Sequence, residues 1–318
     1  MAEFRAYYSP EDAIGVNLRE TAERFELLCE QELGHIRELA IEIAEENESL
    51  TDVLASLPDL SLVQSTARSA PIPVESRTAL ETLHTLHTAH RKLLLCKELK
   101  KKLSEKAPLT ADVFFSDNTE HSALSENRVF YQKSNYTDSA YLQFASLLHT
   151  PRAAYAHSFP AACEEVFNGL CEYCILPIEN TSEGTLHSFL RLIERYELKI
   201  AATCEISDRT AERTTQVALL CKNLLPPLAI DQKADFFAFS IPSDPSGLSD
   251  VLTSARLCGL GIHRFDMLPI SADRVSARII LQINDGDLEA FLLYLAMDQP
   301  QYVPLGLYSH VTSANKRI

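Results

Sequence analysis

The sequence predicts a multidomain protein of mixed α+β and α/β class, built in three parts. Apolar residues recur with a helical period in residues 10–48 and again in 75–105. Strand-like and helix-like patterns alternate through residues 127–222, which indicates an open, mostly parallel sheet with helices on both faces. Residues 235–310 follow the order strand, helix, strand, strand, helix, strand, which is typical of a ferredoxin-like fold. We therefore expect domains at 1–110, 127–225 and 234–312.

The N-terminal part is expected to form a helical hairpin. The apolar positions of the first helix are mostly three or four residues apart: Phe25, Leu28, Ile36, Leu39 and Ile43. This helix is acidic, whereas the end of the second is rich in lysine and arginine. Opposite charges favour a hairpin or a dimer over nucleic-acid binding by the basic helix.

The middle part is expected to contain one α/β lobe. Strands are expected at 129–132, 153–156, 173–177, near 199–206 and at 214–220, and helices at 138–148, 159–168 and 185–196. For the C-terminal part we expect strands at 236–242, 262–270, 275–283 and 303–310, with helices at 246–258 and 287–297.

The composition excludes several classes of function. A net charge of −15 argues against nucleic acid and anionic membranes as partners. No run of about 18 apolar residues predicts a membrane span, and no signal peptide is recognisable, so a cytoplasmic location is expected. Cys171 and Cys174 form the only C-x-x-C pair among eight cysteines, so neither a metal nor a cofactor is expected.

The stretch 174–185, CILPIENTSEGT, reads as a buried strand that ends in a polar turn, with a helix beginning just after Gly184. Ligands bind beyond the carboxyl ends of strands in open α/β sheets, where helix N-termini also attract anions. The expected binding residues are Asn180, Thr181, Ser182, Gly184 and Thr185, with Glu179 as an acid/base group. The same residues are equally consistent with a purely structural turn, in which Ser182 or Thr181 caps the helix.

Residues 157–186 resemble prephenate dehydratase, whose hallmark is a strand ending in P-I-E-N-S, then two residues and G-S/T. Pro177, Ile178, Glu179, Asn180, Gly184 and Thr185 match, and Thr181 replaces the serine. The C-terminal part resembles the ACT regulatory domain, and the first long helix resembles that of helical chorismate mutase. The order of the three parts resembles the bifunctional chorismate mutase/prephenate dehydratase.

The chain departs from that family in ways that imply impaired catalysis. The resemblance implies a second lobe after the strand near 199–206, yet only eight residues separate Ile206 from Thr215. Thr215 takes the place of the family's catalytic threonine, but Gln216 replaces its arginine. An arginine and a lysine that bind chorismate in the mutase family fall at Ile36 and Asn47, so no mutase activity is expected.

The resemblance also implies an effector site in the ACT-like part, at Gly247, Leu248 and Asp266. The favoured interpretation is a dimeric regulatory or ligand-binding homologue in phenylalanine biosynthesis, which binds a small anionic or aromatic amino-acid-like ligand. One alternative is an active prephenate dehydratase, converting prephenate to phenylpyruvate, water and carbon dioxide, with its site completed by a partner chain. The other is a dimeric interaction scaffold.

Overall fold

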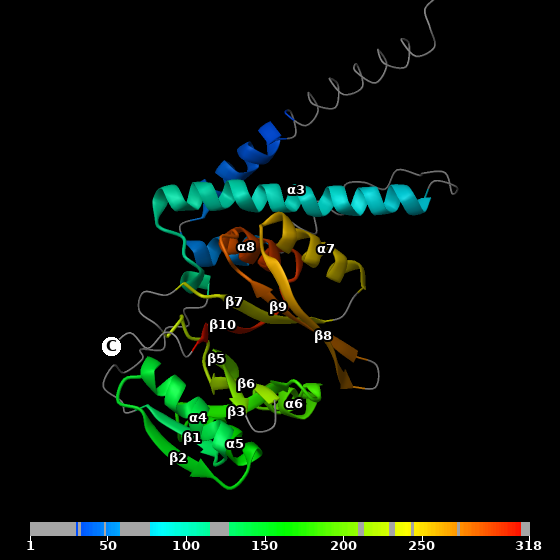
Figure 1. The fold of residues 1–318 in the computed structure, drawn as a ribbon. Helices are drawn as coiled ribbons and strands as arrows, with labels where there is room; N and C mark the ends of the chain where they lie inside the picture. The colour runs from blue at the N-terminus through cyan, green and yellow to red at the C-terminus, as the bar shows by residue number, and fades with distance from the viewer. Residues whose placement is uncertain are drawn as a thin grey trace, which may run out of the picture. The chain divides into compact units, whose positions relative to one another are not determined.

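The computed structural model describes residues 30, 33–47, 49–57, 77–114, 127–208, 213–228, 233–242, 245–271 and 274–312 (Figure 1). The chain divides into two compact units, Met1–Leu109 and Thr110–Ile318, and each is described by itself. Within the described residues, no helix is both long enough and apolar enough to span a membrane.

The first unit is helical where it is described. Residues 33–46 and 50–57 are helical, and α3 spans Arg77–Lys106. Buried side chains from all three segments form its core, including Ile36, Ala40, Val53, Leu95 and Leu99. The expected first helix ends at residue 46, and its beginning lies outside the described residues.

Two details of this unit differ from the sequence-based expectation. The helix at 50–57 was not predicted; Ser49 and Asp52 start it, since each side chain accepts a hydrogen bond from the backbone N–H of the other. An ion pair joins Arg37 of the first helix to Glu98 of α3 at 3.6 Å, and this pair, with its cation on the acidic helix, was not predicted.

The second unit is built on one ten-stranded sheet in the order β2-β1-β3-β6-β5-β10-β7-β9-β8, with β4 paired to β3 (Figure 1). The strands of its first half are β1 Arg128–Gln132, β2 Arg152–Ala156, β3 Tyr173–Asn180, β4 Gly184–Thr185, β5 Lys199–Asp208 and β6 Arg213–Cys221. The helices are η2 Ala111–Phe114, α4 Asn135–Phe144, η3 Ala145–Leu147, α5 Phe159–Phe167 and α6 His187–Arg195.

The first half of the sheet is mixed: β2, β1, β3 and β5 run in one direction, as predicted for a mostly parallel lobe, and β6 runs against them. Strands β2, β1 and β3 are parallel to one another. Strand β6 is antiparallel to both of its neighbours, β3 and β5. Only residues 209–212 lie between β5 and β6, and so short a connection allows only antiparallel pairing.

The second half of the sheet has the element order β7 Phe236–Pro242, α7 Pro245–Leu257, β8 Gly261–Ser271, β9 Arg274–Gln282, α8 Leu288–Asp298 and β10 Val303–Val311. Strand β10 joins the halves. Its first residues pair antiparallel with β7, and Ser309–Val311 pair parallel with Ala202–Cys204 of β5. The two parts that the sequence suggests as separate domains therefore share one hydrogen-bonded sheet.

Apolar side chains cover both faces of the first half of this sheet. One face packs against α4, with Phe144, Ile175 and Leu219 in its core. The other packs against α5 and α6 and continues onto the second half, where Leu190 and Ile193 of α6 share a core with Ile280. Side chains of the second half thereby lie next to the end of β3.

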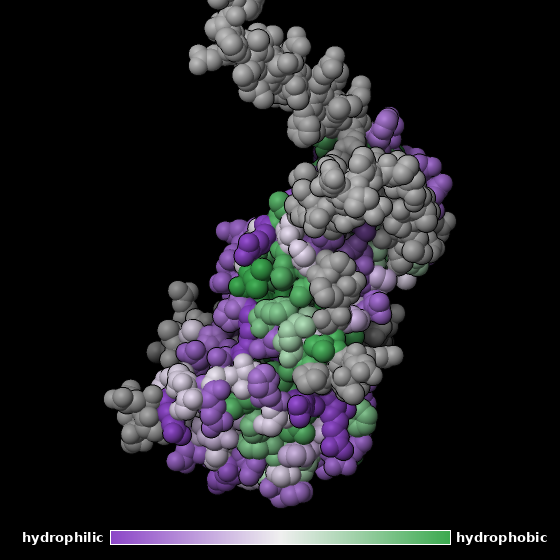
Figure 2. Space-filling view, turned by 90° about the vertical axis from the view of Figure 1, so that its right-hand side faces the viewer, coloured by the Kyte–Doolittle hydropathy of each residue, from purple (hydrophilic) through white to green (hydrophobic). Residues whose placement is uncertain are grey.

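Strand β8 forms one edge of the sheet, on the side of the molecule that faces the reader in Figure 2. Hydrophobic patches alternate with hydrophilic ones on that surface. Phe265 and Met267 of β8 are 39% and 44% exposed, whereas Arg264, Asp266 and Leu268 between and beside them are more buried. This alternation places Arg264 and Asp266 together on the inward face of the strand.

Candidate functional site

A cavity of about 640 Å³ lies where several strand ends meet, and we call it the Glu179 cavity. It is lined by Glu179, Asn180, Thr181, Glu205, Thr214, Gln216, Phe236, His263, Arg264, Phe265, Asp266 and His310. The carboxyl ends of β3, β5 and β10 and the amino end of β6 contribute to it. Ligands of open α/β sheets bind at such strand ends.

A β-bulge sets the direction of Glu179. The register of β3 against β6 shifts between Pro177 and Glu179, so Ile178 is the extra residue and Glu179 lies opposite Gln216. Ile178 stays in the core at 4% exposure. The strand therefore ends with a buried aliphatic side chain followed directly by a carboxylate at the cavity wall.

The polar turn after β3 is closed by Asn180. Its Oδ1 accepts hydrogen bonds from the backbone N–H of Ser182 at 3.0 Å and of Glu183 at 2.6 Å. Gly184 has a φ of +68°, a conformation that glycine adopts without strain. Gly184 and Thr185 then pair back onto β3 as the short strand β4.

The expected helix start after Gly184 was wrong, because α6 begins at His187, after β4. Neither Ser182 nor Thr181 caps this helix, and the residue before it, Leu186, makes no side-chain capping bond. Thr181 is bonded instead to β6, where its hydroxyl accepts from the N–H of Thr214 at 3.2 Å. The turn is thus held by Asn180 and by β6.

Arg264 of β8 reaches across the cavity to the end of β3. Its Nη1 lies 2.5 Å from Oε2 of Glu179, its Nε lies 2.8 Å from Oδ2 of Asp266, and its Nη2 donates to the hydroxyl of Thr185. A bulge between Ile262 and Arg264 shifts the register at this point of β8. One guanidinium therefore engages one residue predicted for catalysis, Glu179, one for substrate binding, Thr185, and one for effector binding, Asp266.

The remaining predicted residues have different positions. Thr214 and Gln216 line the cavity, whereas Thr215 between them does not, because successive side chains of a strand point to opposite faces. Ser182 does not line the cavity either. Gly247 and Leu248 lie in the first turn of α7, apart from the cavity, so only Asp266 of the three expected effector residues reaches it.

The charge of the cavity lining is unfavourable for a dianion. Three carboxylates, from Glu179, Glu205 and Asp266, face a single guanidinium, so the net charge is −2 when both histidines are neutral. Aromatic rings lie at one side of the cavity. The ring of Phe236 lies 4.8 Å from that of His263 and 5.7 Å from that of Tyr308 between centroids.

A second arginine, Arg278 of β9, is buried directly opposite Asp266. It is 2% exposed, and its Nε and Nη1 make no hydrogen bond among the described residues. Burial lowers the pKa of Arg278, while the nearby Tyr308 and Asp266 favour its charged form. Burial also raises the pKa of Glu194 on α6, although the charge of Arg278 opposes that rise.

No cluster of three or more histidine, cysteine or acidic side chains among the described residues could hold a metal ion. Sequence reasoning missed four functional candidates in the cavity: Glu205, His263, Arg264 and His310. Thr203 holds His310 by a 3.1 Å hydrogen bond to Nδ1. These residues lie on strands far apart in the sequence, and no local motif marks them.

Residues 132–209 match the family model of prephenate dehydratase. Over this stretch the chain is similar to prephenate dehydratases. The match runs from the end of β1 to just past β5 and includes Glu179, Asn180 and Thr185. The residues of β6 to β10 lie outside it, Arg264 among them. No curated protein sequence matches the chain.

Several solved structures resemble the chain in part. Prephenate dehydratase of Streptococcus mutans is 15% identical, with a TM-score of 0.47, over 58% of this chain and 100% of that one. GqqA, described as a novel type of quorum quenching acylases, is 20% identical, with a TM-score of 0.44, over 61% and 100%. Prephenate dehydratase of Arthrobacter aurescens, in complex with L-Phe, is 14% identical, with a TM-score of 0.45, over 57% and 90%.

Proposed function

We propose that this protein binds a small amino-acid-like ligand in the Glu179 cavity and is not a working prephenate dehydratase. The observation that carries the proposal is the engagement of Glu179 by Arg264 at 2.5 Å. The ion pair commits Oε2 of Glu179 to Arg264, so this oxygen is not available to contact a leaving hydroxyl.

The construction of the cavity supports the same conclusion. The resemblance to the dehydratase family implies a second lobe between β5 and β6, where this chain has only residues 209–212. The opposite wall of the cavity is supplied instead by β8. Gln216, at the place of the family's arginine, brings no charge to hold a carboxylate of prephenate.

The lining suits a molecule that carries an ammonium group and an aromatic ring. Glu205 supplies negative charge for the ammonium, and Phe236 supplies apolar surface for the ring. A dianion such as prephenate would enter a cavity of net negative charge and would be repelled. The ligand class is therefore a zwitterionic aromatic amino acid, in a regulatory or sensing role near phenylalanine biosynthesis.

The first test is thermal denaturation with phenylalanine, tyrosine, phenylpyruvate and prephenate. A ligand that binds only the folded state raises the melting temperature in a saturable way. We expect a rise with an aromatic amino acid and none with prephenate. Glu205→Gln should abolish the rise, because it removes a cavity carboxylate, whereas Glu289→Gln on α8, outside the cavity lining, should leave it unchanged.

The second test is turnover of prephenate to phenylpyruvate by the purified protein. We expect no rate above the spontaneous one. Turnover that is lost in Asn180→Ala or Thr215→Val would support the rival hypothesis, in which a partner chain completes a dehydratase site. The proposal has further parts. It includes an ACT-like and a mutase-like part, a homodimer and a cytoplasmic location. It also includes an effector role for Gly247, Leu248 and Asp266. An interaction scaffold, the third hypothesis, would show neither response, only an oligomer that depends on concentration.

A further inference from the structure

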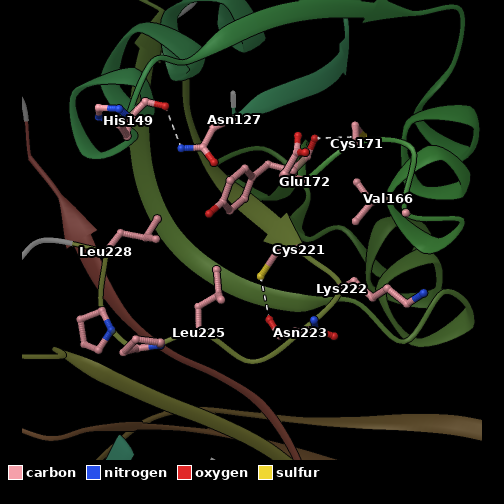
Figure 3. A pocket seen from close by; sticks show the side chains of 14 residues that line it. Asn127, His149, Val166, Cys171, Glu172, Cys221, Lys222, Asn223, Leu225 and Leu228 are labelled. Carbon is pink, nitrogen blue, oxygen red and sulfur yellow. Dashed lines mark hydrogen bonds between the residues drawn. The ribbon is translucent and has the colours of Figure 1, made fainter. Parts of the chain in front are cut away.

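A second cavity lies at the opposite end of β3, and we call it the Tyr173 pocket (Figure 3). Its volume is about 480 Å³, which falls within the range of about 300–1,000 Å³ of small-molecule sites. Tyr173 begins β3 and Cys221 ends β6, and the two are directly paired across the strands. The pocket shares no residue with the Glu179 cavity.

The wall of this pocket is largely apolar and rigid. Leu225, Leu228 and the prolines 226 and 227 form one side, and Val166 of α5 lies on the other (Figure 3). Proline has a fixed φ, so this segment loses little conformational freedom when a ligand binds. Such a wall favours a flat, apolar ligand.

The hydroxyl of Tyr173 is an unused polar group in this pocket. The side chain is 7% exposed, and burial raises its pKa. No hydrogen bond to the hydroxyl exists among the described residues. Because Tyr173 lines the cavity and its hydroxyl has no partner from the chain, the hydroxyl is free to donate a hydrogen bond to a ligand that enters.

Some of the other polar groups at the pocket are already engaged. Glu172 Oε2 accepts from the backbone N–H of Arg128 at 2.8 Å, and Asn127 donates to the carbonyl of His149 at 2.8 Å. The ammonium of Lys222 lies 5.7 Å from the centre of the Phe167 ring. Glu172 and Lys222 carry opposite charges that cancel, so the lining has no net charge to favour a charged ligand over a neutral one when His149 is neutral.

The two thiols of the pocket do not offer covalent chemistry. Burial raises the pKa of Cys171 and of Cys221 to about 12, so both stay protonated at neutral pH. The Sγ of Cys221 donates to the carbonyl of Asn223 at 3.0 Å. Binding here must rest on shape, apolar contact and the Tyr173 hydroxyl.

We propose that the Tyr173 pocket is a second ligand site, for a small, uncharged, flat and mostly apolar molecule with one oxygen that accepts a hydrogen bond from Tyr173. The proposal does not depend on the function proposed for the Glu179 cavity. A single aromatic ring that carries a carbonyl group satisfies all of these requirements.

The test compares two probes of the same shape, acetophenone and α-methylstyrene, which differ by a carbonyl oxygen against a methylene group. Their affinities for the full chain are measured by ligand-observed NMR titration. We expect acetophenone to bind about threefold to tenfold more tightly, as one net hydrogen bond allows. In Tyr173→Phe, which keeps the ring and removes the hydroxyl, this preference should vanish.

A variant that fills the cavity tests whether the probes bind in the Tyr173 pocket. Leu228→Trp should abolish binding of both probes, because the larger side chain occupies the space. Leu142→Trp, at a leucine 70% exposed on α4 and outside the pocket, should change neither affinity. Three outcomes would each overturn the proposal, even if Tyr173→Phe fails to fold. They are equal affinities of the two probes for the unmodified protein, no binding of either probe, and binding that survives Leu228→Trp.

Discussion

Arg264 and Glu179 are 85 positions apart in the sequence, and their side chains meet at 2.5 Å. The arginine belongs to β8, in the second half of the sheet, and the glutamate to β3, in the first. Arg264 also contacts Asp266 and Thr185, so one side chain connects the two halves of the sheet at the cavity.

Replacing Arg264 by alanine should destabilise the second unit. The change leaves the carboxylates of Glu179 and Asp266 without their cation, and the side chains are 41% and 11% exposed. Because Glu179 is partly solvated, we expect a loss of about 2 kcal/mol in the free energy of unfolding, measured by urea denaturation. Arg256→Ala, at an exposed arginine of α7, is the control and should cost less than about 0.5 kcal/mol. Equal losses in the two variants would contradict the structural role of Arg264.

Replacing Arg278 by methionine should have the opposite effect. The guanidinium is buried with two unbonded nitrogen atoms, while Asp266 keeps Arg264 as its partner. An apolar side chain of similar length removes the desolvation cost, so the free energy of unfolding should rise by about 1–3 kcal/mol. The midpoint of urea denaturation measures this change. Arg213→Met, at an exposed position of β6, is the matched control. A fall in the midpoint would contradict the prediction, because it would mean that the attraction between Arg278 and Asp266 outweighs the cost of burying the guanidinium.

The turn after β3 depends on one acceptor atom. Asn180→Ala removes Oδ1 and leaves the N–H groups of Ser182 and Glu183 to solvent, so stability should fall by about 1 kcal/mol. Asn180→Asp keeps the acceptor and should restore most of this loss above pH 5. Thermal denaturation of both variants measures these changes. An aspartate variant as unstable as the alanine variant would contradict the role of the Asn180 side chain as the acceptor that closes the turn.

The buried thiol of Cys204 should make stability fall in alkaline solution. Burial raises its pKa to about 12 in the folded chain, from the ordinary value of 9.0. Between pH 9 and 12 the unfolded chain has therefore lost a proton that the folded chain keeps. The thiol stabilises the fold fully below pH 9, and this contribution declines by about 1.4 kcal/mol per pH unit above it.

The measurement for Cys204 is urea denaturation with reductant at several pH values from 7 to 11. Cys204→Ala is expected to be less stable at pH 7, because it leaves a small cavity. Above pH 9 its stability should decline less steeply than that of the unmodified protein. Other titrating groups act equally on both proteins, so parallel curves would refute the assignment.

The elements of the second unit could be predicted from the sequence because their patterns are local. The strand expected at 129–132 is β1 Arg128–Gln132, and the strand expected at 236–242 is β7 Phe236–Pro242. The pairing of strands is not local, and the direction of β6, which runs against both of its neighbours, was not predicted. The sequence shows how short the β5–β6 connection is, and that length alone requires an antiparallel pair.

The candidate site could be predicted only in its N-terminal half. Glu179, Asn180 and Thr181 form one continuous motif, and all three line the cavity. Arg264 and His310 lie on strands that reach the cavity through tertiary pairing, and the bulge that directs Arg264 leaves no mark in the sequence. Thr215 was predicted from its place in a motif, yet it does not line the cavity. The alternation of side chains along β6 decides which face of the sheet it lies on, and the motif does not show this.

The position of β10 has a consequence for the order of folding. This strand lies between β5 and β7, although it follows every other strand in the chain. During synthesis, one edge of β5 stays unpaired until about a hundred further residues have been made, because its partner on that edge is residues 309–311. The second unit should therefore acquire its full cooperativity only after β10 has left the ribosome, and nascent chains that stop before residue 303 should be the most prone to aggregate.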